Sequence, residues 1–180
     1  MTGQSLDITL SEAAETIVVT RDGLALTLRA VSEEDAVLLA RFYDSLSADD
    51  MQFRFLSAQA HLSTAQLVAM VKVDHRHREH LLAFHQDSGD LVASLLIAAD
   101  EAFEVAEVAI SVASAYKGRG VGWTLLRHAV DLARERGIRR LRCIESRANS
   151  GAIEIERAIG FRSSDYEGDA TIALLEIDLR

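Results

Sequence analysis

The sequence predicts a mixed α/β fold, in which one sheet is covered by helices. Three observations lead to this prediction. The first half of the chain contains pairs of β-type segments joined by Asp-Gly and Ser-Gly turns, the pattern of hairpins. Between these pairs, apolar residues recur at spacings of three and four, as on one face of a helix. The second half contains a strand–helix–strand unit, and this order is typical of a sheet of mixed strand direction.

The first half of the chain is predicted to form two hairpins and two helices. Asp22-Gly23 and Ser88-Gly89 supply the hairpin turns, and Ser32 and Ser63 supply helix caps. The first helix has acidic residues in its first turn, which interact favourably with the helix dipole. The predicted elements are, in order, a hairpin of 17–20 and 24–28, a helix from 32 to 46, a helix from 63 to 73, and a hairpin of 80–86 and 91–99.

The second half is predicted to alternate strands and helices. Gly137 and Gly160 each follow an apolar-periodic segment and are expected to end a helix. Residues 1–15 are polar, acidic and weakly periodic, and are expected to form a loosely ordered tail before a single domain of residues 16–180. The predicted elements are a strand at 103–112, a glycine-rich turn at 117–122, helices at 121–136 and 149–159, and strands at 141–145 and 171–179.

The composition is that of a globular protein and excludes several classes of function. The chain has 180 residues, of which 49% are hydrophobic and 26% charged, and its net charge of −9 argues against a nucleic-acid partner. The longest apolar run, 91–99, is shorter than the roughly 20 residues that cross a membrane. No signal peptide is predicted, and the single cysteine, Cys143, forms no internal disulfide. We therefore expect a soluble cytoplasmic protein without a membrane partner, and leave open a homodimer.

The strand that contains Glu107 carries the first candidate site residue. Alternation places the side chains of Val108, Ile110 and Val112 on one face of this strand. Glu107 shares the other face with the small residues Ala109 and Ser111, which leaves room for a ligand. Glu107 is therefore either a site carboxylate or an ordinary surface acid.

The turn Lys117-Gly118-Arg119-Gly120-Val121-Gly122 has the features of a phosphate-binding loop. Alternating glycines at a helix N-terminus allow backbone amides to converge on an anion, and the helix dipole favours negative charge there. The turn is neither a Walker loop nor a complete dinucleotide fingerprint. Residues 113–147 contain nine basic and three acidic residues, a local net charge of +6. These cations either steer an anionic ligand or form helical pairs such as Arg127–Asp131 and Glu135–Arg139.

The same turn resembles a motif of the GNAT superfamily of N-acetyltransferases. Residues 117–122 match its Arg/Gln-x-x-Gly-x-Gly/Ala pattern, with lysine at the first position. Asn149 followed by Ala158-Ile159-Gly160-Phe161 is similar to a second motif of the family. Further segments resemble Pat-type bacterial protein lysine acetyltransferases: Asp49-Asp50-Met51-Gln52-Phe53-Arg54-Phe55, His61-Leu62-Ser63, and Val73-Asp74 before Leu81-Leu82-Ala83.

The resemblance implies the GNAT fold, whose central, mostly antiparallel sheet has helices on both faces, and acetyl-CoA as co-substrate. The pyrophosphate would lie on the amides of 118–122 and the pantetheine arm along 108–112. Glu107 occupies the position of the subfamily's catalytic glutamate and would act as general base on the acceptor amine, while the Ile110 amide would polarise the thioester carbonyl. The implied cofactor-binding residues are Val108, Ile110, Val112, Lys117, Gly118, Arg119, Gly120, Val121, Gly122 and Asn149.

The implied activity is acetyl transfer to a primary amine by direct attack in a ternary complex. A protein lysine is the first-choice acceptor. A small amine metabolite is the alternative, because the sequence shows none of the regulatory domains often fused to Pat-type enzymes. A non-catalytic acyl-CoA-binding module is the third hypothesis: the family tyrosine that protonates the leaving thiolate is replaced here by Glu156. The acid is therefore unassigned, with Tyr116 as one candidate.

Several other residues have simpler interpretations. Asn149 is either a helix cap or a pantetheine contact, and Cys143 is interpreted as a small buried hydrophobe. His75, His77 and His80 are expected in a solvated loop, with a lid over the acceptor site as the second interpretation. Their spacing does not match a zinc site, so no metal is predicted.

Overall fold

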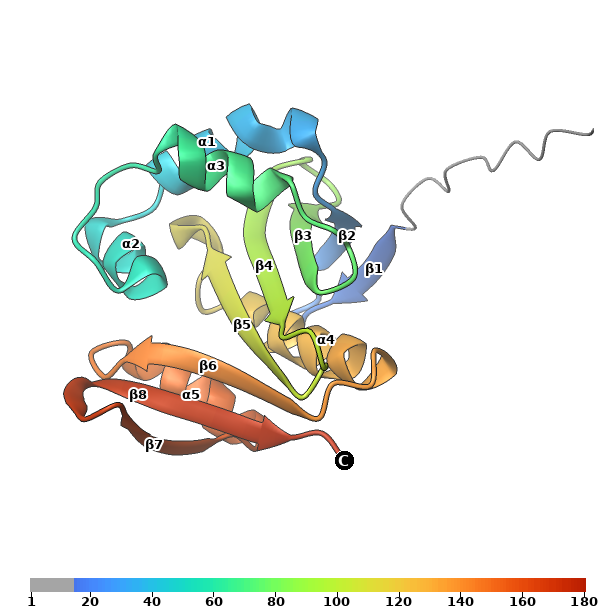
Figure 1. Cartoon of the computed structure of the whole chain (residues 1–180). Coiled ribbons are helices and arrows are strands. Elements are labelled where there is room, and N and C mark those ends of the chain that lie inside the picture. The colour runs from blue at the N-terminus through green and yellow to red at the C-terminus, as the bar shows by residue number, and fades with distance from the viewer. Residues whose placement is uncertain (1–14) are drawn as a thin grey trace, which may run out of the picture.

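The computed structural model describes residues 15–180, so the predicted tail lies outside the described residues except for Glu15. Eight strands form one sheet in the order β1-β2-β3-β4-β5-β6-β8-β7 (Figure 1). The strands are β1 (Thr16–Val19), β2 (Ala25–Ala30), β3 (Arg78–His85), β4 (Leu91–Ala99), β5 (Val105–Val112), β6 (Arg140–Ser146), β7 (Arg162–Tyr166) and β8 (Asp169–Asp178).

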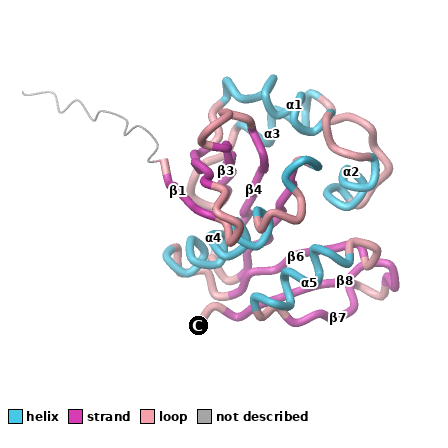
Figure 2. The backbone as a smooth tube through the Cα atoms, turned by 180° about the vertical axis from the view of Figure 1, so that it is seen from behind, coloured by secondary structure: helices cyan, strands magenta, loops and turns pink. Residues whose placement is uncertain are grey.

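Helices cover both faces of this sheet, as predicted. Helices α4 and α5 lie on one face, and α1 and α3 lie on the other (Figures 1 and 2). Helix α2 stands beside the separated ends of β5 and β6 (Figure 1). The helices are α1 (Ala36–Asp44), α2 (Ala48–Phe55), α3 (Thr64–Val71), α4 (Val121–Glu135) and α5 (Ser150–Ile159).

The sheet is mostly antiparallel, and its one parallel pair, β5–β6, is short. This pair runs from Val105 opposite Arg140 to Glu107 opposite Arg142. Beyond that point β5 continues to Val112 and β6 continues to Ser146, but the two strands separate (Figure 1). Every other neighbouring pair of strands is antiparallel. The strand directions confirm the predicted fold class.

The predicted elements are found, and helix α2, strand β7 and a 3-10 turn at Ser114–Tyr116 were not predicted. The first helix begins with a 3-10 turn, Glu33–Asp35, and the other predicted ends agree within two residues. Helix α2 was missed because it is short and polar on average, so its few apolar residues gave only a weak periodic signal. Its N-terminus is fixed by Ser47, whose hydroxyl accepts a hydrogen bond from the Asp50 amide. Strand β7 was missed because it is a polar strand at the edge of the sheet.

The core consists of apolar side chains on both faces of the sheet. On one face, Leu95, Val108 and Leu141 pack against α4 and α5. On the other face, Leu82 packs against residues of α1 and α3. Cys143 is 3% exposed within the first of these clusters, which confirms that it is a small buried hydrophobe.

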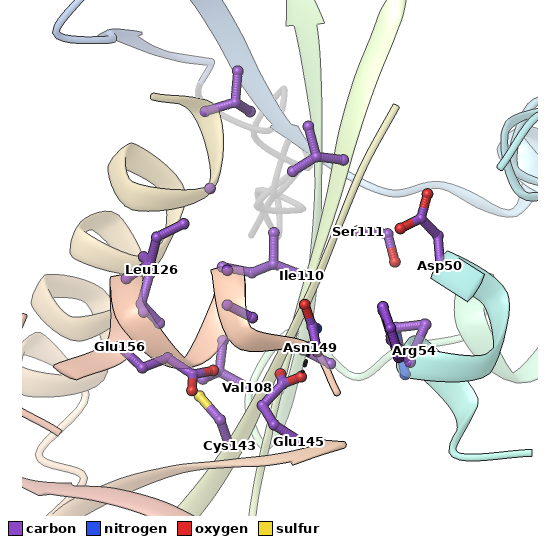
Figure 3. Close-up of a pocket in the computed structure, with 18 of the residues that line it drawn as sticks. Asp50, Arg54, Val108, Ile110, Ser111, Leu126, Cys143, Glu145, Asn149 and Glu156 are labelled. Carbon is purple, nitrogen blue, oxygen red and sulfur yellow. Dashed lines mark hydrogen bonds between the residues drawn. The ribbon is translucent and has the colours of Figure 1, made fainter. Parts of the chain in front are cut away.

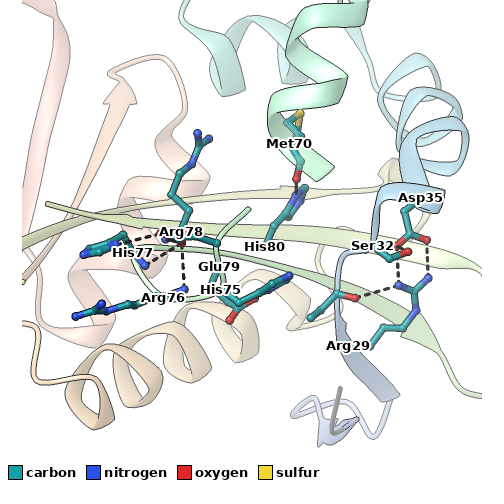
Figure 4. Close-up of polar contacts among 12 residues, drawn as sticks. Arg29, Ser32, Asp35, Met70, His75, Arg76, His77, Arg78, Glu79 and His80 are labelled. Carbon is teal, nitrogen blue, oxygen red and sulfur yellow. Dashed lines mark hydrogen bonds and ion pairs between the residues drawn. The ribbon is translucent and has the colours of Figure 1, made fainter. Parts of the chain in front are cut away.

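The prediction that His80 lies in a solvated loop is wrong. Strand β3 begins at Arg78, two residues earlier than expected, and His80 is fully buried. Its Nδ1 lies 2.7 Å from the Met70 carbonyl oxygen (Figure 4). Its Nε2 lies 2.7 Å from Ser94 Oγ. The Tyr43 hydroxyl extends this chain, 3.2 Å from Ser94 Oγ. Both ring nitrogens are satisfied, so the neutral imidazole is compatible with the core.

His75 and His77 lie in the loop before β3, as predicted. His77 Nδ1 lies 3.0 Å from the Asp74 carboxylate, and His75 Nδ1 lies 2.9 Å from Glu79 (Figure 4). Arg136, after the end of α4, donates to the other Glu79 oxygen at 2.5 Å. These contacts join the loop to the end of α4.

The burial of His80 predicts that acid destabilises the protein. Burial lowers the pKa of His80 to about 4, whereas the ordinary value is 6.5. As pH falls from 6.5 towards 4, the unfolded chain therefore binds a proton that the native protein does not. The free energy of unfolding should decrease over this range by up to about 3 kcal/mol. In His80→Gln the decrease should be smaller, as measured by urea unfolding at several pH values. An equally steep decrease in the variant would contradict the assignment.

Candidate active site

A cavity of about 900 Å³ opens where β5 and β6 separate. Its walls come from α2, β5, β6, α5 and the N-terminal turn of α4 (Figure 3). We call it the central cavity. The predicted site residues that line it are Glu107, Val108, Ile110, Val112, Lys117, Gly118, Gly120, Val121, Gly122 and Asn149.

Arg119 is the one predicted site residue that is not among those lining the central cavity. Its guanidinium lies over the Tyr116 ring, 5.4 Å from the ring centroid. The Tyr116 hydroxyl donates a hydrogen bond to Asp90, at 3.2 Å. The loop at residues 74–77 and the buried His80 also lie outside the cavity lining, which removes the support for their interpretation as a lid over the acceptor site.

The backbone of β5 presents hydrogen-bonding groups to the central cavity. The amide of Ala113 donates to Val92 of β4, and the carbonyl of Glu104, just before β5, accepts from the amide of Arg140 in β6. Because successive peptide groups alternate between the two sides of a strand, those of Val108, Ile110 and Val112 point towards β6. Strand β6 no longer pairs with β5 at this level. These groups can therefore bind an extended ligand that takes the place of a neighbouring strand.

The glycine-rich turn brings backbone amides to the other end of the cavity. Gly118 and Gly120 have φ values of 71° and 77°, in the left-handed region that favours glycine. Gly120 directly precedes α4, whose first amides have no partner within the helix. A Cβ atom at Gly120 would lie 3.4 Å from the Thr20 side chain, so the turn is also closely packed. Free amides and the positive end of a 15-residue helix make this end suitable for a phosphate group.

Lys117 links the glycine-rich turn to α2. Its ammonium group forms an ion pair with the carboxylate of Asp50, in the first turn of α2. Burial works against the charged form of Asp50, but hydrogen bonds from Lys117 and Ser47 outweigh it and lower the pKa of this carboxyl. Both partners line the central cavity, so an anion bound at the turn would meet a cation that is already paired.

Most of the cations at residues 113–147 are paired, but with other partners than the two predicted ones. Asp131 pairs with Arg134 at 3.4 Å, and Arg139 pairs with Glu104, next to β5, at 2.8 Å. Arg127 lies over the Trp123 ring at 5.4 Å instead of pairing with Asp131. The two predicted helical pairs are therefore absent from the described chain. Because acids elsewhere in the fold neutralise most of these cations, their attraction for an anionic ligand is weaker than the local charge of +6 suggests.

Glu107 lies on the α2 side of the sheet, at the point where β5 and β6 separate. Its carboxylate is 3.4 Å from a guanidinium nitrogen of Arg142, the residue paired with it on β6. The side chain is 44% exposed. The arginine orients the carboxylate while leaving it accessible from the cavity.

A second group of polar side chains lies on the α5 side. Asn149 precedes α5, but its side chain makes no cap hydrogen bond; its amide donates instead to Glu145, at 2.9 Å (Figure 3). Burial raises the pKa of both Glu145 and Glu156, and for Glu156 the neighbouring Glu145 carboxylate adds to the effect. Burial likewise raises the pKa of the Cys143 thiol, and the two neighbouring acids raise this pKa further.

Sequence reasoning did not identify Glu145 and Glu156 as a pair. A signal was present for Glu156, because it lies three residues from both Ile153 and Ile159, on the face of α5 that packs against the sheet. For Glu145 the signal was its place in the strand, because alternation puts it on the same face as Leu141 and Cys143. Both acids line the central cavity.

Comparison with known proteins agrees with this geometry. Residues 40–161 match the family model of the acetyltransferase (GNAT) family. The GNAT domain of S. lividans PAT is 31% identical and superposes with a TM-score of 0.83, over 92% of this chain and 97% of that one. An acetyltransferase of Pseudomonas aeruginosa is 28% identical over 83% of this chain and 82% of its own length. Streptothricin acetyltransferase of Streptomyces lavendulae is 40% identical over 67 residues, covering 34% of this chain and 35% of that protein.

Proposed function

The chain belongs to the GNAT family of acetyltransferases, and we propose that it transfers the acetyl group of acetyl-CoA to the side-chain amine of a protein lysine. Glu107 is the general base in this proposal, and residues 16–180 act as one domain. The observation that carries it is the position of Glu107 in the cavity, beside the level at which the β5 backbone loses its partner strand.

The central cavity has groups that suit acetyl-CoA. The peptide groups of Val108, Ile110 and Val112 would bind the amides of the pantetheine arm, as a neighbouring strand would. The amides of 118–122 and the N-terminus of α4 would hold the pyrophosphate, together with Lys117. The Ile110 amide points towards β6, where it would polarise the thioester carbonyl. Asn149 lines the cavity and would contact the pantetheine arm.

The α2 side of the cavity suits a lysine side chain. A lysine has a four-carbon apolar stem and a terminal ammonium group. Its stem would pack against apolar side chains, and its ammonium group would reach Glu107. The ammonium must lose a proton before it attacks the thioester, because its ordinary pKa is about 10.4. The apolar residues on this side are Leu46, Phe53, Phe55 and Leu56.

A small amine is the second candidate acceptor. The match to streptothricin acetyltransferase favours it, because that protein is named for a small-molecule acceptor. The match covers about a third of each chain, whereas the likeness to the S. lividans domain covers nearly all of both. We therefore retain the protein lysine as the first choice.

The acceptor class can be tested by measuring CoA thiol released from acetyl-CoA with a cleared cell lysate separated by size. We expect release with the protein fraction, accompanied by acetyl-lysine in mass spectra of that fraction. Release with the metabolite fraction alone would overturn the lysine assignment in favour of a small amine. No release with either fraction, despite acetyl-CoA binding, would contradict transfer to an amine.

Replacing the proposed base should reduce turnover but not co-substrate binding. In Glu107→Gln we expect kcat to fall by about 10²-fold or more, because the amide cannot accept the ammonium proton. The Kd for acetyl-CoA, measured by calorimetry, should remain unchanged. The matched control is Glu104→Gln, since Glu104 directly precedes β5, is half-exposed and lies outside the cavity lining. A wild-type rate in Glu107→Gln would exclude Glu107 as the base.

Replacing a glycine of the phosphate-binding turn should weaken acetyl-CoA binding. At φ 77°, a valine at position 120 is strained and contacts Thr20, so the turn must shift. A residue with a Cβ atom costs about 1–2 kcal/mol in this left-handed region, which corresponds to about tenfold or more in the Kd for acetyl-CoA. Gly168→Val is the control, because Gly168 has a φ of 80° with open space around it and lies between β7 and β8. Equal affinity in both variants would place the pyrophosphate elsewhere.

A further inference from the structure

Two carboxyl groups that the proposed transfer does not use lie inside the central cavity. Glu145 is near the end of β6, and Glu156 is on α5 (Figure 3). Glu156 is only 4% exposed, and its Oε2 has no hydrogen-bond partner in the described part of the chain. An acid that is buried against a cavity and lacks a partner on one oxygen is costly for folding, which makes a functional role worth testing.

The two acids lie across the sheet from Glu107. Glu107 and Arg142 are opposite each other in the β5–β6 pair, so their side chains share the α2 side. Alternation along β6 then directs Cys143 and Glu145 to the side where α5 lies. Figure 3 shows the Glu156 carboxyl beside Cys143 there. The cavity thus has a carboxylate on its acceptor side and a pair of carboxyl groups on the opposite side.

The surroundings of the pair favour one bound proton, placed on Glu156. Two adjacent carboxyl groups, one buried and one half-buried, resist double ionisation, which agrees with the raised pKa values of both. Of the two, Glu145 is more readily ionised. The Asn149 amide donates a hydrogen bond to its carboxylate, and the positive charge of Arg54 in α2 favours the ionised form. Among the described residues, no cation acts on the Glu156 carboxyl.

The other neighbours do not supply a competing proton. The Cys143 thiol is buried in the core, and burial together with Glu156, Glu145 and Glu107 of β5 raises its pKa. Helix α4 contributes the apolar Leu126 to this part of the wall. Tyr116, the other candidate acid, already donates its hydroxyl proton to Asp90.

We propose that Glu156 is a catalytic residue, the acid that protonates the departing CoA sulfur, and that Glu145 is a positioning residue that keeps the proton on Glu156. This inference rests on the proposed acetyl transfer. The amine nitrogen forms a bond to the thioester carbonyl carbon, and the carbon–sulfur bond breaks with its electron pair left on sulfur. Before this step Glu107 has passed the ammonium proton to solvent, so it can accept the second proton, which nitrogen loses as the amide forms. The Glu156 proton moves to the departing sulfur. Solvent then restores both groups.

The test compares Glu156→Gln and Glu145→Gln with the wild-type full-length chain, using acetyl-CoA and the acceptor fraction that supports release. In Glu156→Gln we expect kcat to fall by at least about tenfold, with the KM for acetyl-CoA unchanged. Wild-type activity should decline at alkaline pH, as Glu156 loses its proton, and the variant should lack this decline. A variant with the wild-type kcat and the same alkaline decline would overturn the proposal.

Glu145→Gln separates a proton donor from a merely structural acid. This variant retains the Glu156 carboxyl but removes the neighbouring charge that helps to raise its pKa. The alkaline decline should therefore move to lower pH, while kcat on the acidic side is retained. An unchanged pH profile would show that the pair does not control the proton.

An infrared measurement tests the proton independently of activity. The wild-type protein at neutral pH should show the C=O stretch of a protonated buried carboxylic acid. This band should persist in Glu145→Gln and weaken in Glu156→Gln. Absence of this band in the wild type would overturn the proposal even if Glu156→Gln failed to fold. If the wild-type protein releases no CoA with any acceptor, the proposed function itself fails. If the wild-type protein is active and neither substitution changes its activity or pH profile, only the roles proposed for Glu156 and Glu145 fail.

Discussion

Peptide groups inside a protein need hydrogen-bond partners, and the site depends on a place where the sheet does not supply them. The β5–β6 pair ends at Glu107 and Arg142, although both strands continue. The flanking layers hold the strands apart: α2 contacts both from one side, and α4 and α5 cover the other. The sheet thus contains an internal edge that is protected from other chains yet open to a slender ligand. Strand edges are usually covered or blunted, so an open edge inside a sheet is well suited to binding.

The two faces of the sheet give this opening different chemistry. On the α2 side, Glu107 is half-exposed and held by Arg142, which suits a group that exchanges protons with an incoming amine. On the α5 side, Glu145 and Glu156 are largely buried between β6 and α5, which suits a group that retains a proton at neutral pH. The three glutamates therefore suit different roles in the proposed transfer, because their burial and their partners differ. The proposed transfer uses a proton acceptor and a proton donor, and the two faces of the sheet supply them separately.

The features that the sequence predicted well are those governed by neighbouring residues. Glycine at positive φ, alternation along β5 and the length of α4 are local properties, and they located the glycine-rich turn and Glu107. The features that were missed depend on partners distant in sequence. His80 is buried because Met70 and Ser94 satisfy its ring, and Arg139 pairs with Glu104, 35 residues away. Helix α2 is polar, so its apolar pattern could not reveal it. The acid pair could not be predicted because α5 brings its members together only in the folded chain.

Lys117 forms an ion pair with Asp50 of α2, so a phosphate bound at the glycine-rich turn and the Asp50 carboxylate would compete for the same ammonium group. A phosphate that draws the lysine towards the glycine-rich turn takes it from the first turn of α2, the helix that carries the aromatic side chains of the acceptor wall. Linkage of this kind is reciprocal: whatever tightens the lysine on α2 weakens its hold on the anion by the same free energy. The first ligand to arrive therefore changes the surface that the second one meets.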